Sequence, residues 1–117
     1  MTGVSLVIEN DAGREALLRL AEAGLREGEC LVKIVDVVGV RRAVRTTPSS
    51  PGAELVAREV PQVLRGGLTS LVSYYRVPTS SLDATETHSV DGDVSHTYDV
   101  LLNVARVGVK SASVLPA

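Results

Sequence analysis

The sequence predicts a two-layer α/β domain in which two helices pack on a mixed four-stranded sheet. Three observations predict this fold: short β-branched apolar runs, an amphipathic stretch after the first of them, and a proline-led segment with helical spacing after the second. A chain of 117 residues is long enough for one domain with a single modest core. We therefore expect residues 1–117 to form one domain with the element order β-α-β-α-β-β.

The first three elements follow from changes in hydrophobic period. Residues 4–9, VSLVIE, form a short apolar run that predicts a strand. Leucine and alanine then recur at helical spacing over residues 10–28, where Gly28 can end the helix in a left-handed conformation. Residues 29–40, ECLVKIVDVVGV, carry apolar side chains on both faces, which is typical of a central strand.

A start signal predicts the second helix. Ser50 is a good N-cap residue, and Pro51 suits the first helical position. The segment GAELVAREV, residues 52–60, then places its apolar side chains at helical spacing. Pro61 cannot continue the hydrogen-bond ladder, so we expect the helix to kink or restart there.

The last two strands are predicted at residues 69–77 and 96–110, and they can pair as an antiparallel hairpin. Residues 78–95 between them are polar and acidic, which predicts a protruding loop. An alternative fold pairs residues 32–38 with residues 40–46 about Gly39. This pairing would give a ferredoxin-like α+β core with an extra strand. The lack of an Asn-Gly or Asp-Gly turn at that point favours the first fold.

Composition and charge exclude several classes of protein. The formal net charge is -2 and the pI is about 5.6, so no global basic field attracts nucleic acid or a membrane. The single cysteine, Cys30, excludes an internal disulfide and a cysteine-rich zinc site, and it is typical of a reducing compartment. No signal-peptide pattern or long apolar window is present. We expect a cytoplasmic protein with no membrane partner.

The strongest candidate site lies in residues 38–55, VGVRRAVRTTPSSPGAEL. Its arginines, Arg41, Arg42 and Arg45, precede several hydroxyl side chains and the start of the predicted second helix at Ser50. Free N–H groups at a helix start and guanidinium groups both bind phosphate, which predicts an anion-binding turn. In the alternative interpretation, Ser50 only caps the helix and the arginines are solvated or paired with glutamates. The chain has no glycine-rich phosphate loop with its lysine.

Asp36 and Tyr74 are polar residues within apolar segments, and each could have either a functional or a structural role. Asp36 lies within an apolar strand and could be a general base, but pairing with Arg41 or Arg76 is the favoured interpretation. Tyr74 could stack on a base or ligand, or it could pack in the core or at a subunit interface. Cys30 shares an apolar face with its neighbours, so we expect an inert core thiol.

The acidic loop and the strand after it contain residue types that bind metal ions. They are His88, Asp91, Asp93, His96 and Asp99. The run lacks the glutamate that a calcium-binding EF-hand loop requires, and no pair of histidines has helical spacing. A solvated acidic loop is therefore favoured over a weak divalent-ion site. We expect no metal, no cofactor and no catalytic set.

The predicted element order, with its extended arm, resembles that of the Alba superfamily of small nucleic-acid-binding proteins. The local piece is VGVRRAVRT, residues 38–46, whose place is similar to that of a basic segment in this family. The resemblance covers roughly residues 4–110 and lies in the order of elements. It implies that Arg41, Arg42 and Arg45 contact nucleic acid in a dimer with two arms along the grooves. The acidic arm of this chain would repel duplex phosphates, which favours RNA or a strand presented by a partner.

The leading functional hypothesis is thus a non-enzymatic, Alba-like module that contacts phosphates of RNA or DNA. Its contact residues would be Arg41, Arg42, Arg45, Ser50 and Tyr74. Two alternatives remain: a binding protein or enzyme subunit for small anions or nucleotide phosphates, and a structural assembly or protein-interaction module. Strands 29–40 and 98–109 hold more apolar surface than two short helices cover, so we expect a homodimer or higher homo-oligomer.

Overall fold

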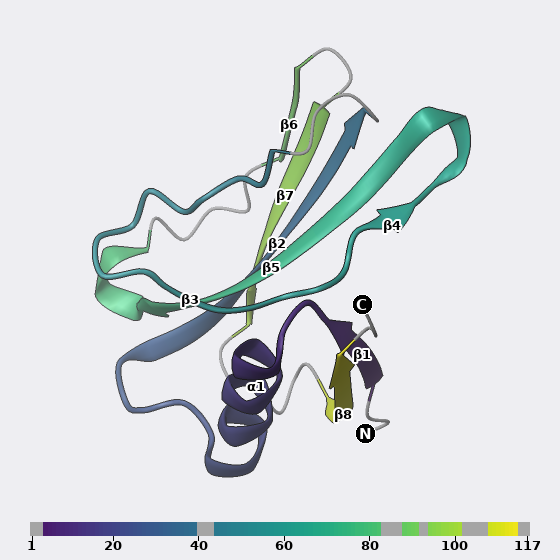
Figure 1. Ribbon diagram of the computed structural model, residues 1–117. Helices are drawn as coiled ribbons and strands as arrows, with labels where there is room; N and C mark the ends of the chain where they lie inside the picture. The colour runs from purple at the N-terminus through teal and green to yellow at the C-terminus, as the bar shows by residue number, and fades with distance from the viewer. Residues whose placement is uncertain (1–3, 40–43, 83–87, 92–93, 102–107, 115–117) are drawn as a thin grey trace.

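A computed structural model describes residues 4–39, 44–82, 88–91, 94–101 and 108–114 of the chain (Figure 1). Eight strands, one α-helix and two short 3-10 turns lie in these ranges. The elements are β1 (Val4–Ile8), α1 (Asp11–Ala23), β2 (Glu29–Gly39), β3 (Glu54–Arg58), β4 (Gln62–Val63), η1 (Arg65–Gly67), β5 (Leu68–Pro78), η2 (Thr79–Ser81), β6 (His88–Asp91), β7 (Val94–Leu101) and β8 (Val109–Val114). No helix in the described ranges is long and apolar enough to cross a membrane.

Two sheets organise this part of the chain. The larger one is entirely antiparallel and has the strand order β3-β5-β2-β7-β6, with β4 also paired to β5. The smaller sheet pairs β1 with β8 in parallel. Figure 1 shows this small sheet beside α1, at one end of the larger sheet. The end of β1 also meets the chain after β3, because Ile8 forms a β-bridge with Glu59.

The predicted fold class is wrong, because the described residues contain one helix and two sheets instead of two helices on a four-stranded sheet. Residues 52–60, predicted as the second helix, contain β3. This strand pairs with β5 from Glu54 opposite Arg76 to Arg58 opposite Ser73. A β-bulge falls between Leu55 and Ala57, so the apolar side chains do not alternate strictly and imitate helical spacing. Pairing with a long neighbouring strand overrides the local preference.

The ferredoxin-like alternative is also wrong. It required residues 32–38 to pair with residues 40–46, but β2 has β5 on one edge and β7 on the other. The predicted long strand at 96–110 is shorter, because β7 ends at Leu101 and β8 belongs to the other sheet. In the predicted acidic loop, residues 88–91 form β6 and pair with β7.

The first predicted helix is confirmed, although it ends earlier than expected. The Asn10 side chain accepts a hydrogen bond from the Gly13 N–H at 2.8 Å and caps the start. Gly24 follows the last turn with a φ of 79°, and its N–H donates to the Leu20 carbonyl, so the helix stops before Gly28. Its buried Leu17 packs in a core between the helix, the small sheet and one face of the larger sheet.

The opposite face of the larger sheet has a second core. Its buried members are Cys30, Val32, Ile34, Tyr75 and Val77. The chain between β2 and β3 crosses this face without regular secondary structure over residues 44–53. Ala53 of this segment packs against the second core. We call residues 44–53 the crossover segment, and it provides a cover where the sequence predicted the start of a helix.

Candidate functional site

Arg45 is the one arginine of the predicted anion-binding turn that the structure describes; Arg41 and Arg42 lie outside the described residues. Its guanidinium donates to the Val72 carbonyl at 2.8 Å, the Ser73 hydroxyl at 3.3 Å and the Glu59 carbonyl at 2.9 Å. Burial is the main cause that lowers the pKa of Arg45. These contacts tie the crossover segment to β5, so this guanidinium serves the fold.

Ser50 lies in a turn of the crossover segment, and Tyr74 lies in the core. Ser50 lies in a turn where its carbonyl accepts from the Ala53 N–H at 3.3 Å, and no helix starts there. Tyr74 is only 1% exposed, and its hydroxyl donates to the Glu59 carboxylate at 2.5 Å. Burial first, and then this hydrogen bond and the charge of Glu59, raise the pKa of Tyr74. A ring at this depth is not available to stack on a base.

Asp36 is buried with an exposed fraction of 0%, and its carboxylate contacts the crossover segment. The sequence favours pairing with Arg41, which lies outside the described residues, or with Arg76. Among the described residues, the carboxylate accepts from the Thr46 N–H at 2.9 Å and from the Thr46 hydroxyl. Arg76 lies on the other face of the sheet, where it meets two glutamates. The carboxylate therefore anchors the crossover segment to β2.

The other sequence candidates do not assemble a site in the described residues. No group of three or more His, Cys, Asp or Glu side chains there could hold a metal ion. His96 lies against Tyr98 with ring centroids 5.7 Å apart, and Asp93 falls outside the described residues. Cys30 is buried, its thiol donates to the Val77 carbonyl at 3.4 Å, and burial raises its pKa.

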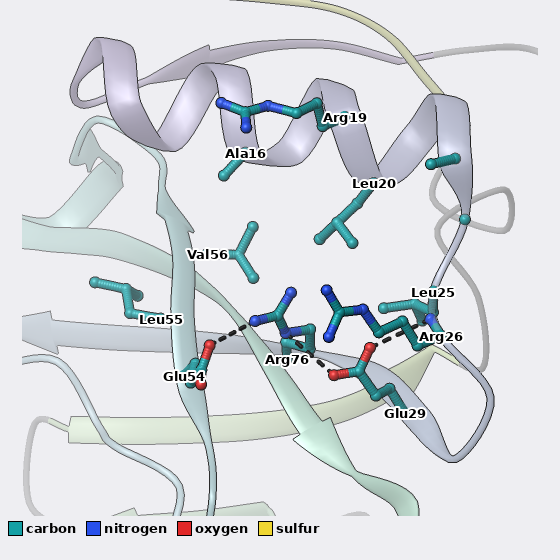
Figure 2. Close-up of a pocket in the computed structure, with 12 residues that line it drawn as sticks. Ala16, Arg19, Leu20, Leu25, Arg26, Glu29, Glu54, Leu55, Val56 and Arg76 are labelled. Carbon is teal, nitrogen blue, oxygen red and sulfur yellow. Dashed lines mark hydrogen bonds and ion pairs between the residues drawn. The ribbon is translucent and has the colours of Figure 1, made fainter.

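A cavity of about 600 Å³ lies between the C-terminal half of α1 and the strands β3 and β5 (Figure 2). It was not predicted from the sequence. Its lining residues are Ala16, Arg19, Leu20, Ala23, Gly24, Leu25, Arg26, Glu29, Glu54, Leu55, Val56 and Arg76. We call this cavity the groove. Its volume falls within the range of about 300–1,000 Å³ that is typical of ligand sites.

The groove exists because α1 approaches β3 closely at one end only. Gly13 lies so near β3 that a Cβ atom there would be 3.2 Å from the Cα of Ala57. About one, two and three turns further along the helix, Ala16, Leu20 and Ala23 line the groove instead. Figure 2 shows Ala16 and Leu20 directed toward it. The helix therefore seals the sheet at its N-terminal end and leaves space at its C-terminal end.

The charged groups of the groove are unevenly paired. The Arg76 guanidinium contacts the Glu29 carboxylate at 3.3 Å and the Glu54 carboxylate at 2.6 Å. Glu29 also accepts from the Arg26 backbone N–H at 3.2 Å. No ion pair joins the Arg26 guanidinium to another described residue, and Figure 2 shows this guanidinium pointing into the groove. Arg26 is thus the cation with spare hydrogen-bonding capacity.

β3 forms one wall of the groove and one edge of the larger sheet. In the described part of the chain, no strand pairs with the outer edge of residues 54–57. Beyond them the edge is occupied, because the Glu9 N–H donates to the Arg58 carbonyl at 2.8 Å. Leu55 on this edge is 45% exposed. A short stretch of unpaired strand edge therefore borders an apolar cavity.

Comparison with known proteins identifies no relative: the chain matches no protein-family model, no curated protein and no solved structure. The expected resemblance to the Alba superfamily depended on an element order that differs from the one observed. Functional inference therefore depends on the geometry of this chain alone.

Proposed function

We propose that this chain is a non-enzymatic protein-interaction module that binds an extended segment of a partner protein as an added strand on β3. The unpaired outer edge of residues 54–57 beside the groove is the observation that carries the proposal. An exposed edge offers its backbone N–H and C=O groups to another chain, and a neighbouring pocket selects the side chains of that chain. The protein-interaction alternative from the sequence is thus the one that the geometry favours.

The lining of the groove supports a peptide as the occupant. Leu20, Leu25 and Val56 offer an apolar wall for one or two aliphatic side chains. The two glutamates are held by Arg76, so they do not obstruct the edge with unpaired charge. Strand addition uses main-chain hydrogen bonds for affinity and such apolar contacts for specificity.

A substitution that fills the groove tests the proposal. Ala16→Phe places a ring in the groove, whereas Ala12→Phe places the same ring on an exposed position of the same helix. We would select peptides from pooled libraries in which random segments are displayed at chain ends and within a carrier. The selected peptides should bind wild type and Ala12→Phe equally, and Ala16→Phe at least about tenfold more weakly. Failure to enrich any sequence, or equal binding to Ala16→Phe, would refute the proposal.

Nucleic-acid binding through Arg41 and Arg42 stays a prediction, and the same preparation can test it. Arg45 is left unchanged, because its guanidinium holds the crossover segment. Titration of labelled RNA against salt should show weaker binding for Arg41→Ala/Arg42→Ala if the prediction holds. Sedimentation of the same sample tests the predicted self-association. A cytoplasmic location also stays a prediction.

A further inference from the structure

We infer that the groove selects segments that end in a free C-terminal carboxylate after an aliphatic residue, and that Arg26 binds the carboxylate. This inference rests on the proposed peptide-binding function. It adds the chemical nature of the segment and the direction in which it lies. Three observations carry it: the polarity of the sheet, the position of Arg26, and the pairing of the neighbouring charges.

The polarity of the sheet sets the direction of an added strand. Every strand pair of the larger sheet is antiparallel, and antiparallel pairing is the more frequent and slightly more stable arrangement. β3 runs from Glu54 to Arg58. An antiparallel partner on its outer edge therefore ends beside Glu54. Because the Glu9 contact occupies the edge at Arg58, only the last residues of the partner can pair with β3, and the residues before them approach over the surface.

Arg26 is located where that partner strand ends. Glu54, Arg76, Glu29 and Arg26 line the same part of the groove, and Figure 2 shows the guanidinium groups of both arginines directed into it. A guanidinium group binds a carboxylate through two parallel N–H···O hydrogen bonds. Leu20 and Leu25 lie beside it and can accept the last aliphatic side chain. The groove thus places a cation next to an apolar pocket, which matches a chain that ends in an aliphatic residue.

The pairing of the neighbouring charges argues against the opposite polarity. A parallel strand would bring an α-amino group to this end of the groove. The Glu29 and Glu54 carboxylates that could bind it already accept from Arg76, and Glu29 also accepts from the Arg26 N–H. An incoming amine would therefore face the charges of Arg26 and Arg76. An incoming carboxylate meets an arginine without an ion-pair partner among the described residues.

Two displayed libraries separate this inference from the proposed function. In one, random hexapeptides form the free C-terminus of the display protein; in the other, the same hexapeptides continue into a constant Gly-Ser tail. We expect sequences with a final aliphatic residue to be enriched from the first library only. Enrichment from both libraries to the same degree would overturn the inference and leave the proposed function in place. Enrichment from neither would overturn both.

Calorimetric titration of the selected hexapeptide then tests the role of Arg26. The C-terminal amide should bind wild type about tenfold more weakly than the free acid. Arg26→Gln should weaken the acid by a similar factor and leave the amide unchanged. Arg65→Gln, which removes the same charge from an exposed turn away from the groove, should bind both like wild type. If amidation has no effect, or if N-acetylation weakens binding instead, the assignment of the carboxylate to Arg26 is wrong.

Discussion

The two faces of the larger sheet are covered by different kinds of chain. An irregular segment, residues 44–53, crosses one face, and polar groups hold it: the buried Asp36 binds Thr46, and the half-buried Tyr98 donates its hydroxyl to the Thr47 carbonyl at 3.2 Å. The helix α1 covers part of the other face through apolar side chains such as Leu17 and leaves the groove at its C-terminal end. Polar contacts thus hold the irregular segment on the first face, whereas α1 covers the second face incompletely and leaves the groove open.

The difference has a physical cause. A helix satisfies its own backbone N–H and C=O groups, so it can lie on a sheet with apolar contacts alone. An irregular segment has no internal ladder, and each buried backbone group needs a partner from the sheet. Asp36 supplies such a partner for the Thr46 N–H, and Arg45 supplies donors for two carbonyl groups at the sheet edge. Asp36 and Arg45, which the sequence offers as candidate functional residues, therefore stabilise the fold on this face.

The largest effect is expected from Asp36→Ala. The substitution removes both acceptors of Thr46 and leaves its N–H without the carboxylate at a buried site. We expect the free energy of unfolding to fall by about 3 kcal/mol, the usual cost of breaking a buried charged contact. Urea denaturation followed by circular dichroism measures it.

Two variants serve as controls for this prediction. Asp36→Asn retains one acceptor oxygen at the same place and should lose less stability than Asp36→Ala. Asp99→Ala, at an exposed position of β7, should change stability by less than about 0.5 kcal/mol. If Asp36→Ala is as stable as Asp99→Ala, the crossover segment is not held by this contact and the comparison of the two faces fails.

A smaller effect is expected from Tyr74→Phe on the helix-covered face. The substitution removes the hydroxyl that donates to Glu59 and leaves that carboxylate without its partner. A hydrogen bond to a charged group contributes about 1.5–3 kcal/mol, so we expect a loss of about 2 kcal/mol at neutral pH.

The same variant carries a prediction for alkaline pH. The pKa of Tyr74 is raised from its ordinary value of 10.0, so the folded protein keeps a proton that the unfolded chain loses. Below pH 10 this group adds no pH dependence; above it, stability is lost at up to about 1.4 kcal/mol per pH unit. The pKa of Tyr98 is also raised by burial, and Tyr98 therefore contributes the same pH dependence of stability to wild type and to Tyr74→Phe. Stability of Tyr74→Phe should therefore fall less steeply above pH 10, and parallel curves would contradict the assignment.

The sequence predicts the elements that depend on local pattern. The strand at residues 4–9, the first helix and the central strand with Cys30, Val32 and Ile34 on one face are predicted from hydrophobic period. The structure has all three, with β1 ending at Ile8. β3 could not be predicted in this way, because its bulge hides the alternation and its strand partner, β5, comes later in the chain. Once that segment is predicted as a helix, the sheet order is wrong as well.

The groove could not be predicted for a related reason. Its walls come from α1, the turn before β2, and the strands β3 and β5, and they meet only through the sheet order. In the sequence, Arg26 is one of several arginines on the polar side of a helix. Arg45 and Tyr74 are predicted as site residues instead, because their residue types and sequence neighbours do not show that the folded chain buries them. The arginine that is free to bind a ligand is distinguished only by the pairing of its neighbours.

The smallest effect is expected from Gly13→Ala, which tests the closed end of the same helix. A methyl group there would lie 3.2 Å from the Cα of Ala57 and 3.3 Å from the Cγ2 of Ile8. Alanine favours a helix over glycine by about 1 kcal/mol, but overpacking against backbone costs about 1–3 kcal/mol. Because Ala57 is fixed by its pairing with β5, we expect a net loss of about 1 kcal/mol in urea denaturation.

The contrast with Ala16→Phe decides the interpretation. That variant adds a whole ring one turn further along the helix and should leave stability within about 0.5 kcal/mol of wild type, because the ring enters the groove. We therefore expect Gly13→Ala to lower the free energy of unfolding more than Ala16→Phe does, because α1 packs tightly at its N-terminal end and leaves space at its C-terminal end. If Gly13→Ala is stabilising while Ala16→Phe is strongly destabilising, α1 is open at its N-terminal end, and a partner strand would have to bind there.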